Sequence, residues 1–150
     1  MNYNSGSSSS SGSACYDNEA SNCAIYGRLY DWPTAMAVCP FGWHLPIDSE
    51  WDILLDHAGD SSTAGTKLKA VNGWIDDGNG TDDYGFSAMP GGFGSSNGNF
   101  YNAGGYGSWW VAAENDNNRA HYRYIYSYDD NINGNYDSKS NLFSVRCLKD

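Results

Sequence analysis

Four cysteines constrain this chain more than any other feature of its sequence. They are Cys15, Cys23, Cys39 and Cys147, and none of them forms the closely spaced Cys pair typical of a zinc site. Three disulfide pairings are possible. Cys15 and Cys23 are 8 residues apart, which suits a small closed loop. We favour Cys15–Cys23 together with Cys39–Cys147 over four reduced thiols. The second bridge ties an early helix-like run to a late strand-like run.

Disulfides of this kind persist in oxidising compartments, so the pattern predicts a secreted or cell-surface protein. No run of apolar residues reaches transmembrane length, and we expect no membrane insertion. Met1 leads directly into Asn2 and a serine tract, without the apolar run of a signal peptide. We therefore expect either a start introduced for expression, or a processed or excised piece of a longer protein.

The composition indicates one loop-rich domain with short strands. The chain has 150 residues, among them 12 Tyr, 6 Trp and 18 Gly. Its 18 acidic residues outnumber its 8 basic ones, which gives a net charge of -10. Such a surface repels phosphate groups, so nucleic acids and anionic membranes are excluded as expected partners.

The order of the predicted elements indicates an α+β fold. Residues 1–14 form a flexible Ser/Gly-rich lead, and residues 15–150 form the domain. Helices are predicted at 33–38, capped by Asp31, at 48–57, ended by Gly59, and at 63–71. Strands are predicted at 26–30, 86–89, 108–113, 121–128 and 142–148, with a long loop at 95–107 and a turn at 133–135. Helices first and strands later is typical of α+β domains.

Several separated motifs agree in order with one known family. They are Tyr26-Gly27-Arg28-Leu29-Tyr30-Asp31-Trp32, Cys39-Pro40-Phe41-Gly42-Trp43-His44-Leu45-Pro46, Glu50-Trp51, Gly85-Phe86-Ser87-Ala88-Met89-Pro90-Gly91-Gly92, Trp109-Trp110 and Phe143-Ser144-Val145-Arg146-Cys147. Over about residues 15–150 the chain resembles the Fibrobacter succinogenes major paralogous domain. That family is similar to formylglycine-generating-enzyme-type domains with a C-type-lectin-like fold.

The resemblance implies two to three short helices in the N-terminal half, packed on a short, twisted antiparallel sheet. It also implies a disulfide from the first helix to the last strand, where Cys39 and Cys147 lie. One departure is Ile47, where the family usually has a Thr that forms a capping box with Glu50. Because Ile47 cannot cap, we expect the helix to start at Asp48 or to be weakened. The family's opening strand is also missing, which predicts an open sheet edge.

We expect no catalysis. A formylglycine-type oxidase needs reactive cysteines, and the only candidate is Cys147, which lies in an apolar strand and is expected to be bridged. His44 lies in a motif of structural character, and we expect its imidazole to be hydrogen-bonded beneath a helix start. The sequence contains no nucleophile elbow and no paired-acid motif.

The acidic loop at 76–83 is the one candidate metal site, with calcium as the expected ion. Its oxygen donors are Asp76, Asp77, Asn79 and Asp82. The spacing does not match an EF-hand loop, because its sixth position holds no glycine. We favour a solvated acidic loop and predict no cofactor, with bound calcium as the alternative.

The strongest functional signal is the segment at 114–141, which contains seven Asn, five Tyr and four Asp. Strict alternation places Tyr122, Tyr124, Tyr126 and Tyr128 on one face of a strand, and places His121, Arg123, Ile125 and Ser127 on the other. Tyr and Asn side chains make adaptable binding surfaces. The candidate ligand-binding residues are Trp110, Asn115, Asn117, Tyr122, Tyr124, Tyr126, Tyr128 and Tyr136.

Burial decides which of these residues are available to a ligand. We expect Tyr122, Tyr128 and Tyr136 to be exposed, whereas exposure and packing are equally open for Tyr124 and Tyr126. Of the adjacent tryptophans, we expect one in the core and one, Trp110, at the rim. The remaining expected core residues are Trp43, Leu45, Trp51 and Val145.

These features predict a non-catalytic extracellular binding or adhesion module whose aromatic, Asn-rich face recognises a glycan or a protein ligand. One alternative is a structural subunit that assembles into filaments or homo-oligomers. Another follows from a second resemblance. The segment at 114–141 is similar to the variable C-terminal region of diversity-generating-retroelement target proteins, which use lectin-like scaffolds to bind ligands.

Overall fold

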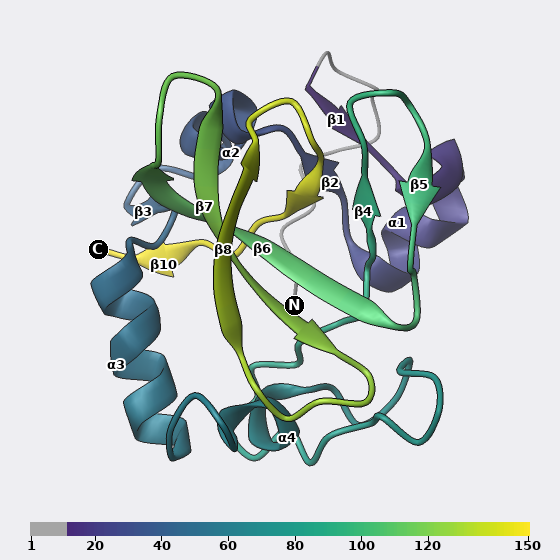
Figure 1. Ribbon diagram of the computed structural model, residues 1–150, viewed down its shortest axis with the longest axis vertical. Helices are drawn as coiled ribbons and strands as arrows, with labels where there is room; N and C mark the ends of the chain where they lie inside the picture. The colour runs from purple at the N-terminus through teal and green to yellow at the C-terminus, as the bar shows by residue number, and fades with distance from the viewer. Residues whose placement is uncertain (1–11) are drawn as a thin grey trace.

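The computed structural model describes residues 12–150, in which short helices precede most of a mixed β-sheet (Figure 1). The helices are the 3-10 helix η1 (Tyr16–Asn18), α1 (Ala20–Tyr26), α2 (Trp32–Val38), α3 (Asp48–Ala58) and α4 (Ala64–Leu68). The strands are β1 (Ser13–Ala14), β2 (Leu29–Tyr30), β3 (Trp43–His44), β4 (Phe93–Gly94), β5 (Phe100–Tyr101), β6 (Tyr106–Glu114), β7 (Arg119–Tyr126), β8 (Asn133–Ser138), β9 (Phe143–Ser144) and β10 (Leu148–Lys149). The prediction of an α+β fold is confirmed.

The main sheet has six strands in the order β1-β2-β9-β6-β7-β8. Its neighbours are antiparallel except for β6 and β9, which run parallel and pair Trp109 with Ser144. The expectation of a purely antiparallel sheet is therefore wrong at this pair. Most of the predicted flexible lead, residues 1–11, lies outside the described residues. Ser13–Ala14 was assigned to that lead, but it forms β1 and pairs with β2.

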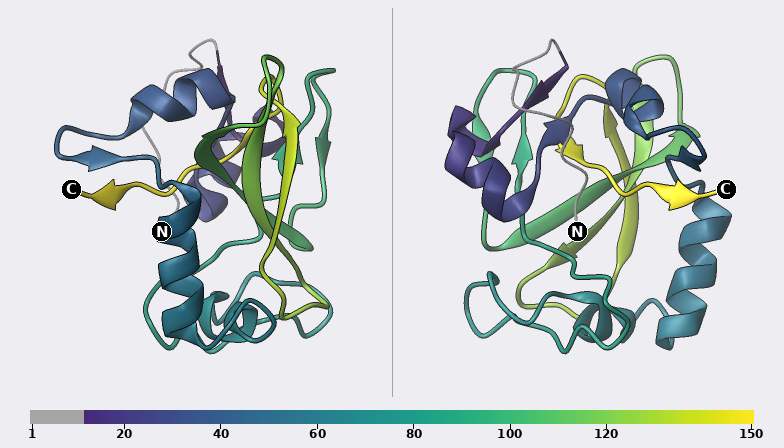
Figure 2. Two further views of the ribbon diagram at one scale, coloured as in Figure 1. Left: turned by 60° about the vertical axis from the view of Figure 1, so that its left-hand side comes forward. Right: turned by 180° about the vertical axis from the view of Figure 1, so that it is seen from behind.

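Both faces of the central strands are covered, which decides where the aromatic residues go. Helices α3 and α4 lie on one face of the sheet (Figure 2). Their apolar side chains pack against Trp109, Val111 and Ile125. On the other face, Trp110 packs with residues of β2, α2 and β9. Adjacent strand residues point to opposite faces. Trp109 and Trp110 are therefore both fully buried, and the prediction that one of them lies at the rim is wrong.

Local sequence signals explain α2 and α3. The Asp31 side chain accepts a hydrogen bond from the Thr34 backbone at 2.9 Å, as the predicted cap requires. Helix α3 starts at Asp48, and Glu50 Oε2 accepts from the Ile47 backbone N–H at 2.9 Å. The Glu half of a capping box is thus kept although Ile47 contributes no side-chain oxygen.

Other elements depart from the sequence-based assignment. Helix α4 is shorter than the predicted helix at 63–71, and α1 was not predicted. Helix α1 has only seven residues and no side-chain cap, but the Cys15–Cys23 bridge ties it to the segment before it. No helix among residues 12–150 combines the length and apolar character needed to cross a bilayer.

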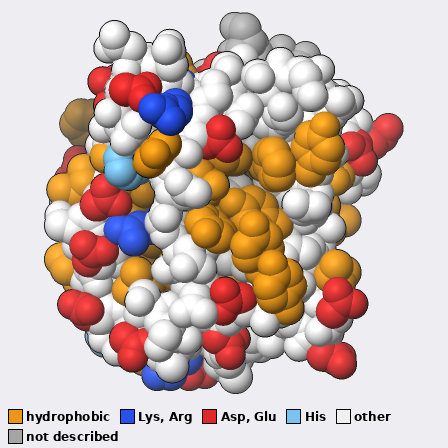
Figure 3. Space-filling view, viewed as in Figure 1, with side chains coloured by type: hydrophobic (Ala, Val, Ile, Leu, Met, Phe, Trp, Pro, Cys, Tyr) orange, Lys and Arg blue, Asp and Glu red, His pale blue; other side chains and the backbone are white. Residues whose placement is uncertain are grey.

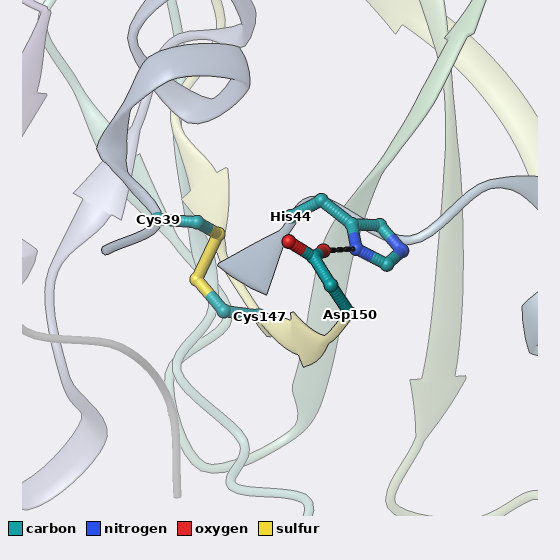
Figure 4. The surroundings of a disulfide bond; sticks show 4 residues. All are labelled: Cys39, His44, Cys147 and Asp150. Carbon is teal, nitrogen blue, oxygen red and sulfur yellow. Dashed lines mark hydrogen bonds and ion pairs between the residues drawn. A yellow bond between two sulfur atoms is a disulfide. The ribbon is translucent and has the colours of Figure 1, made fainter. Parts of the chain in front are cut away.

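The predicted disulfides are both present. Cys15 is bonded to Cys23, and Cys39 is bonded to Cys147 with a Cα–Cα distance of 5.7 Å. The second bridge joins the end of α2 to the segment between β9 and β10, beside the short β3–β10 pair (Figure 4). Trp43, expected in the core, is 44% exposed because β3 projects away from the main sheet (Figure 2).

The predicted turn at 133–135 is wrong, because these residues open β8 and pair with β7. The chain reverses instead between β7 and β8, at 127–132. Buried Lys69 holds this reversal, since its Nζ donates to the Ser127 and Asp129 carbonyls at 3.0 and 2.7 Å. The predicted strand at 86–89 is reduced to a single bridge between Lys69 and Ala88.

The other strand assignments are partly confirmed. The predicted strands at 26–30, 108–113 and 121–128 correspond to β2, β6 and β7. The last predicted strand, at 142–148, is interrupted and yields β9 and β10. The predicted loop at 95–107 contains β5, which pairs with β4 as a hairpin.

Candidate ligand-binding cleft

Four tyrosines form a continuous row along β7 and beyond its end. The ring centroids of Tyr122 and Tyr124 are 5.6 Å apart, those of Tyr124 and Tyr126 are 5.6 Å apart, and those of Tyr126 and Tyr128 are 5.1 Å apart. The prediction that alternation places them on one side is confirmed. Exposure rises along this tyrosine row, from 8% at Tyr122 to 78% at Tyr128.

A cleft of about 250 Å³ opens beside this row, between the β4–β5 hairpin and strands β6 to β8. We call it the tyrosine cleft. Its lining residues are Phe93, Asn102, Tyr106, Tyr122, Tyr126, Asp137 and Phe143. Figure 3 views this side of the molecule and shows hydrophobic side chains gathered over the ends of β6 and β7, with a further group over β4 and β5.

The cleft has a buried aromatic floor and more exposed polar edges. Tyr106, Tyr122 and Phe143 are 6%, 8% and 1% exposed and form the floor. Asp137 is half-buried, and Asn102 is exposed. The arrangement offers apolar ring surface next to a carboxylate and an amide, which is the mixture found in ligand sites.

The tyrosines of the cleft remain neutral phenols. Burial raises the pKa of Tyr106 far above its usual value, and nearby Tyr122 raises it further. Burial likewise raises the pKa of Tyr122 and of Tyr126. These hydroxyl groups therefore keep their protons at physiological pH and can donate hydrogen bonds.

Several predicted site residues lie elsewhere. Trp110 is in the core, where its Nε1 donates to the Tyr30 carbonyl at 2.7 Å. Tyr122, expected to be exposed, is in the floor of the cleft because it pairs with Trp110 across the covered face. Tyr136 is 44% exposed as expected. However, it pairs with His121 and so lies on the opposite face of the sheet from the tyrosine row.

Asn115 and Asn117 are separated from the cleft along the strand. They lie exposed in the turn before β7, whereas Tyr126 ends that strand. Eight residues of strand put the two ends about 23 Å apart. The predicted set is therefore split into a cleft at one end of β7 and a polar turn at the other.

Sequence reasoning missed Phe93, Asn102, Tyr106, Asp137 and Phe143. Asp137 follows the 133–135 stretch that was interpreted as a turn, so its position in a strand was not seen. Had 133–138 been predicted as a strand, alternation would have placed Asp137 and Tyr136 on opposite faces of the sheet. Phe93 and Asn102 come from the β4–β5 hairpin, and no local signal connects that hairpin to the tyrosines.

The acidic loop uses part of its predicted calcium donors for its own structure. Asn79 Oδ1 accepts from the Trp74 backbone at 3.0 Å. The Asp82 carboxylate accepts from both the backbone and the hydroxyl of Ser87, at 2.6 and 2.5 Å. Within residues 12–150, no three His, Cys, Asp or Glu side chains converge as metal ligands.

A second cavity, of about 330 Å³, lies between α3 and the C-terminal segment. Its polar groups have structural roles. Glu50 contacts His44 at 2.9 Å, and Arg146 donates to the Ser87 carbonyl at 2.8 Å while lying over the Phe86 ring. His44 Nδ1 also lies 2.6 Å from Asp150 (Figure 4). The expectation that His44 is held beneath a helix start is confirmed.

Comparison with known proteins supports the family indicated by the motifs. The family model described as the Fibrobacter succinogenes major domain matches residues 3–149. No curated protein and no solved structure matches the chain. With nearly the whole chain covered by one family model, this protein belongs to the Fibrobacter succinogenes major domain family.

Proposed function

We propose that this domain is a non-catalytic binding or adhesion module that holds a glycan or protein ligand at the tyrosine cleft. The observation that carries the proposal is the cleft itself. Five aromatic rings line a hollow whose edge bears Asn102 and Asp137. Such a combination provides stacking surface and hydrogen-bonding groups at low entropy cost.

The scaffold that presents the cleft is proposed to be C-type-lectin-like. Its support is the bridge from the end of α2 to the C-terminal strand region, with the helices preceding most of the sheet. The two disulfides are consistent with an oxidising environment, and they support the proposal that the domain is secreted or lies on the cell surface.

The test is ligand retention by a variant with Tyr124→Ala and Tyr126→Ala. The immobilised domain is screened against a glycan array and a displayed peptide library, with Tyr136→Ala as the control because Tyr136 is on the opposite face. We expect the double variant to lose retention while its circular dichroism spectrum is unchanged. Equal retention by both variants, or no retention of any ligand by the unmodified domain, contradicts the proposal.

A second candidate, self-assembly, is favoured by a different surface. Phe41 is fully exposed, and Trp43 and Leu148 of the β3–β10 pair are 44% and 42% exposed. Trp43 pairs with Lys149 and Leu148 pairs with His44, so the two apolar side chains lie on opposite faces of the strand pair. Large exposed apolar side chains are candidates for subunit contacts. Light scattering after size exclusion tests this candidate. A mass that rises with concentration, and falls back to the monomer in Phe41→Ser, supports assembly. A constant monomer mass opposes it.

A further inference from the structure

The tyrosine cleft combines aromatic rings with one negative charge and no positive one. Among residues 12–150, its five rings come from Phe93, Tyr106, Tyr122, Tyr126 and Phe143, and its only ionisable group other than tyrosine is Asp137. No Lys or Arg of this described part of the chain lines the cleft. A site of this composition repels anions, and it differs from an ordinary apolar pocket by its carboxylate.

The rings are inclined to one another and do not form a single stack. Phe93 meets Tyr106 and Phe143 at interplanar angles of 73°. Tyr106 and Tyr126 lie 4.9 Å apart at 43°, and Tyr122 and Phe143 lie 4.6 Å apart at 46°. Inclined rings present π surface and edges from several directions around one hollow. The π faces carry negative electrostatic potential, which attracts cations.

Asp137 adds a full negative charge beside this aromatic surface. Its carboxylate accepts from the Ser138 backbone at 2.7 Å and forms no ion pair within residues 12–150. It lies close enough to Tyr122 to act electrostatically on that hydroxyl. The net charge of -10 also attracts cations to the protein as a whole. A half-buried carboxylate next to aromatic rings is best satisfied by a positively charged ligand.

We propose, building on the binding role proposed above, that the cleft recognises an organic ammonium group. The ammonium lies among the aromatic rings with Asp137 as its counter-ion, and Asn102 at the edge contacts the rest of the ligand. The volume of about 250 Å³ is below the range of about 300–1,000 Å³ typical of drug-sized ligand sites, so the cleft holds one head group. A lysine side chain of a partner protein, a quaternary amine and an amino sugar share this chemistry.

Charged probes and their neutral isosteres test the proposal. Choline is compared with 3,3-dimethylbutan-1-ol, Nα-acetyl-lysine amide with Nα-acetyl-2-aminoheptanoic acid amide, and glucosamine with glucose. Each is titrated into the ¹⁵N-labelled domain while amide chemical shifts in β7 and β8 are followed. We expect at least one cation to bind about tenfold or more tightly than its neutral isostere. The cation that binds most tightly indicates whether the ammonium comes from a quaternary amine, a lysine side chain or an amino sugar.

Variants then assign the effect to the cleft. Asp137→Asn and Tyr126→Leu are each expected to weaken cation binding by about two- to thirty-fold. The matched controls are Asp116→Asn and Tyr136→Leu, which lie outside the cleft lining, with Tyr136 on the opposite face of the sheet. Both are expected to leave binding unchanged.

The outcomes separate this proposal from the general binding role. Equal affinity for each cation and its isostere, or no shift with any cation, overturns the ammonium assignment. Equal weakening by the cleft variants and their controls overturns it too. If the Tyr124→Ala, Tyr126→Ala double variant still loses a glycan or peptide ligand in those cases, the binding role stands with a different ligand chemistry.

Discussion

Removing the Cys39–Cys147 bridge is expected to destabilise this domain about twice as much as removing Cys15–Cys23. The first bridge joins residues separated by 108 positions and the second by 8. A longer closed loop removes more conformational freedom from the unfolded chain. The chain-entropy relation gives about 5 kcal/mol for the long loop and about 2.5 kcal/mol for the short one at 25 °C.

Packing in the folded state adds to the loss at both bridges, since Cys23 of the short bridge is also buried. Cys39 and Cys147 are partly buried against the core cluster that contains Trp110 and Phe143. Replacing them with alanine removes these contacts in addition to the cross-link. The two-residue strands β3 and β10, which flank the bridge, also become less well held.

The assay is urea unfolding of the Cys39→Ala, Cys147→Ala and the Cys15→Ala, Cys23→Ala double variants, followed by tryptophan fluorescence. Free energies of unfolding come from linear extrapolation. Domains of this kind have total stabilities of about 5–15 kcal/mol, so the unmodified protein is measured first. If its stability is below about 5 kcal/mol, we expect the long-bridge variant to be unfolded without urea. Equal losses in both variants, or a larger loss from the short bridge, would refute the loop-length argument.

Two further predictions concern polar contacts. Lys69→Met leaves the Ser127 and Asp129 carbonyls without their donor. It should therefore lower the free energy of unfolding, measured by urea titration, by about 2–4 kcal/mol. Hydrogen exchange at the Ile132 amide, which lies in the same reversal, should become faster. An unchanged midpoint contradicts this role. Hydrogen bonds to Asp150 and then Glu50 raise the pKa of His44 above 6.5. Its contribution to stability is therefore complete below pH 6.5 and is lost as the pH rises through the raised value. As the pH rises over that range, the melting temperature of His44→Gln should fall less than that of the unmodified protein. Parallel curves of melting temperature against pH for the two proteins would oppose this role of His44.

Local sequence signals were sufficient to predict an element where residues within the same short segment set its ends. Asp31 and Pro33 define the start of α2, and Gly59 ends α3. They were insufficient where contacts with residues far away in the sequence determine the conformation of a segment. Asn133 to Asn135 has turn composition, but it forms strand because β7 offers a hydrogen-bonding edge and Lys69 holds the true reversal earlier in the chain.

The candidate site shows the same division. Alternation was enough to predict that Tyr124, Tyr126 and Tyr128 share a side, because strand side chains point alternately to opposite faces. It gave no information on Phe93 or Asp137, which reach the cleft from β4 and β8. Strand β8 reaches the cleft by pairing with β7, whereas β4 belongs to the separate β4–β5 hairpin.

The sequence alone favoured the observed cysteine pairing, and it determined the α+β class, the capped start of α2 and the common side of the tyrosines. The class, the cap and the common side depend on element order, on spacing and on neighbours a few residues away. Only the tertiary structure decided that both sheet faces are covered, which buries Trp110, and that Asp137 joins the tyrosine cleft while Tyr136 faces away. The period of a strand places residues on opposite faces, but what covers each face depends on contacts between segments far apart in the chain.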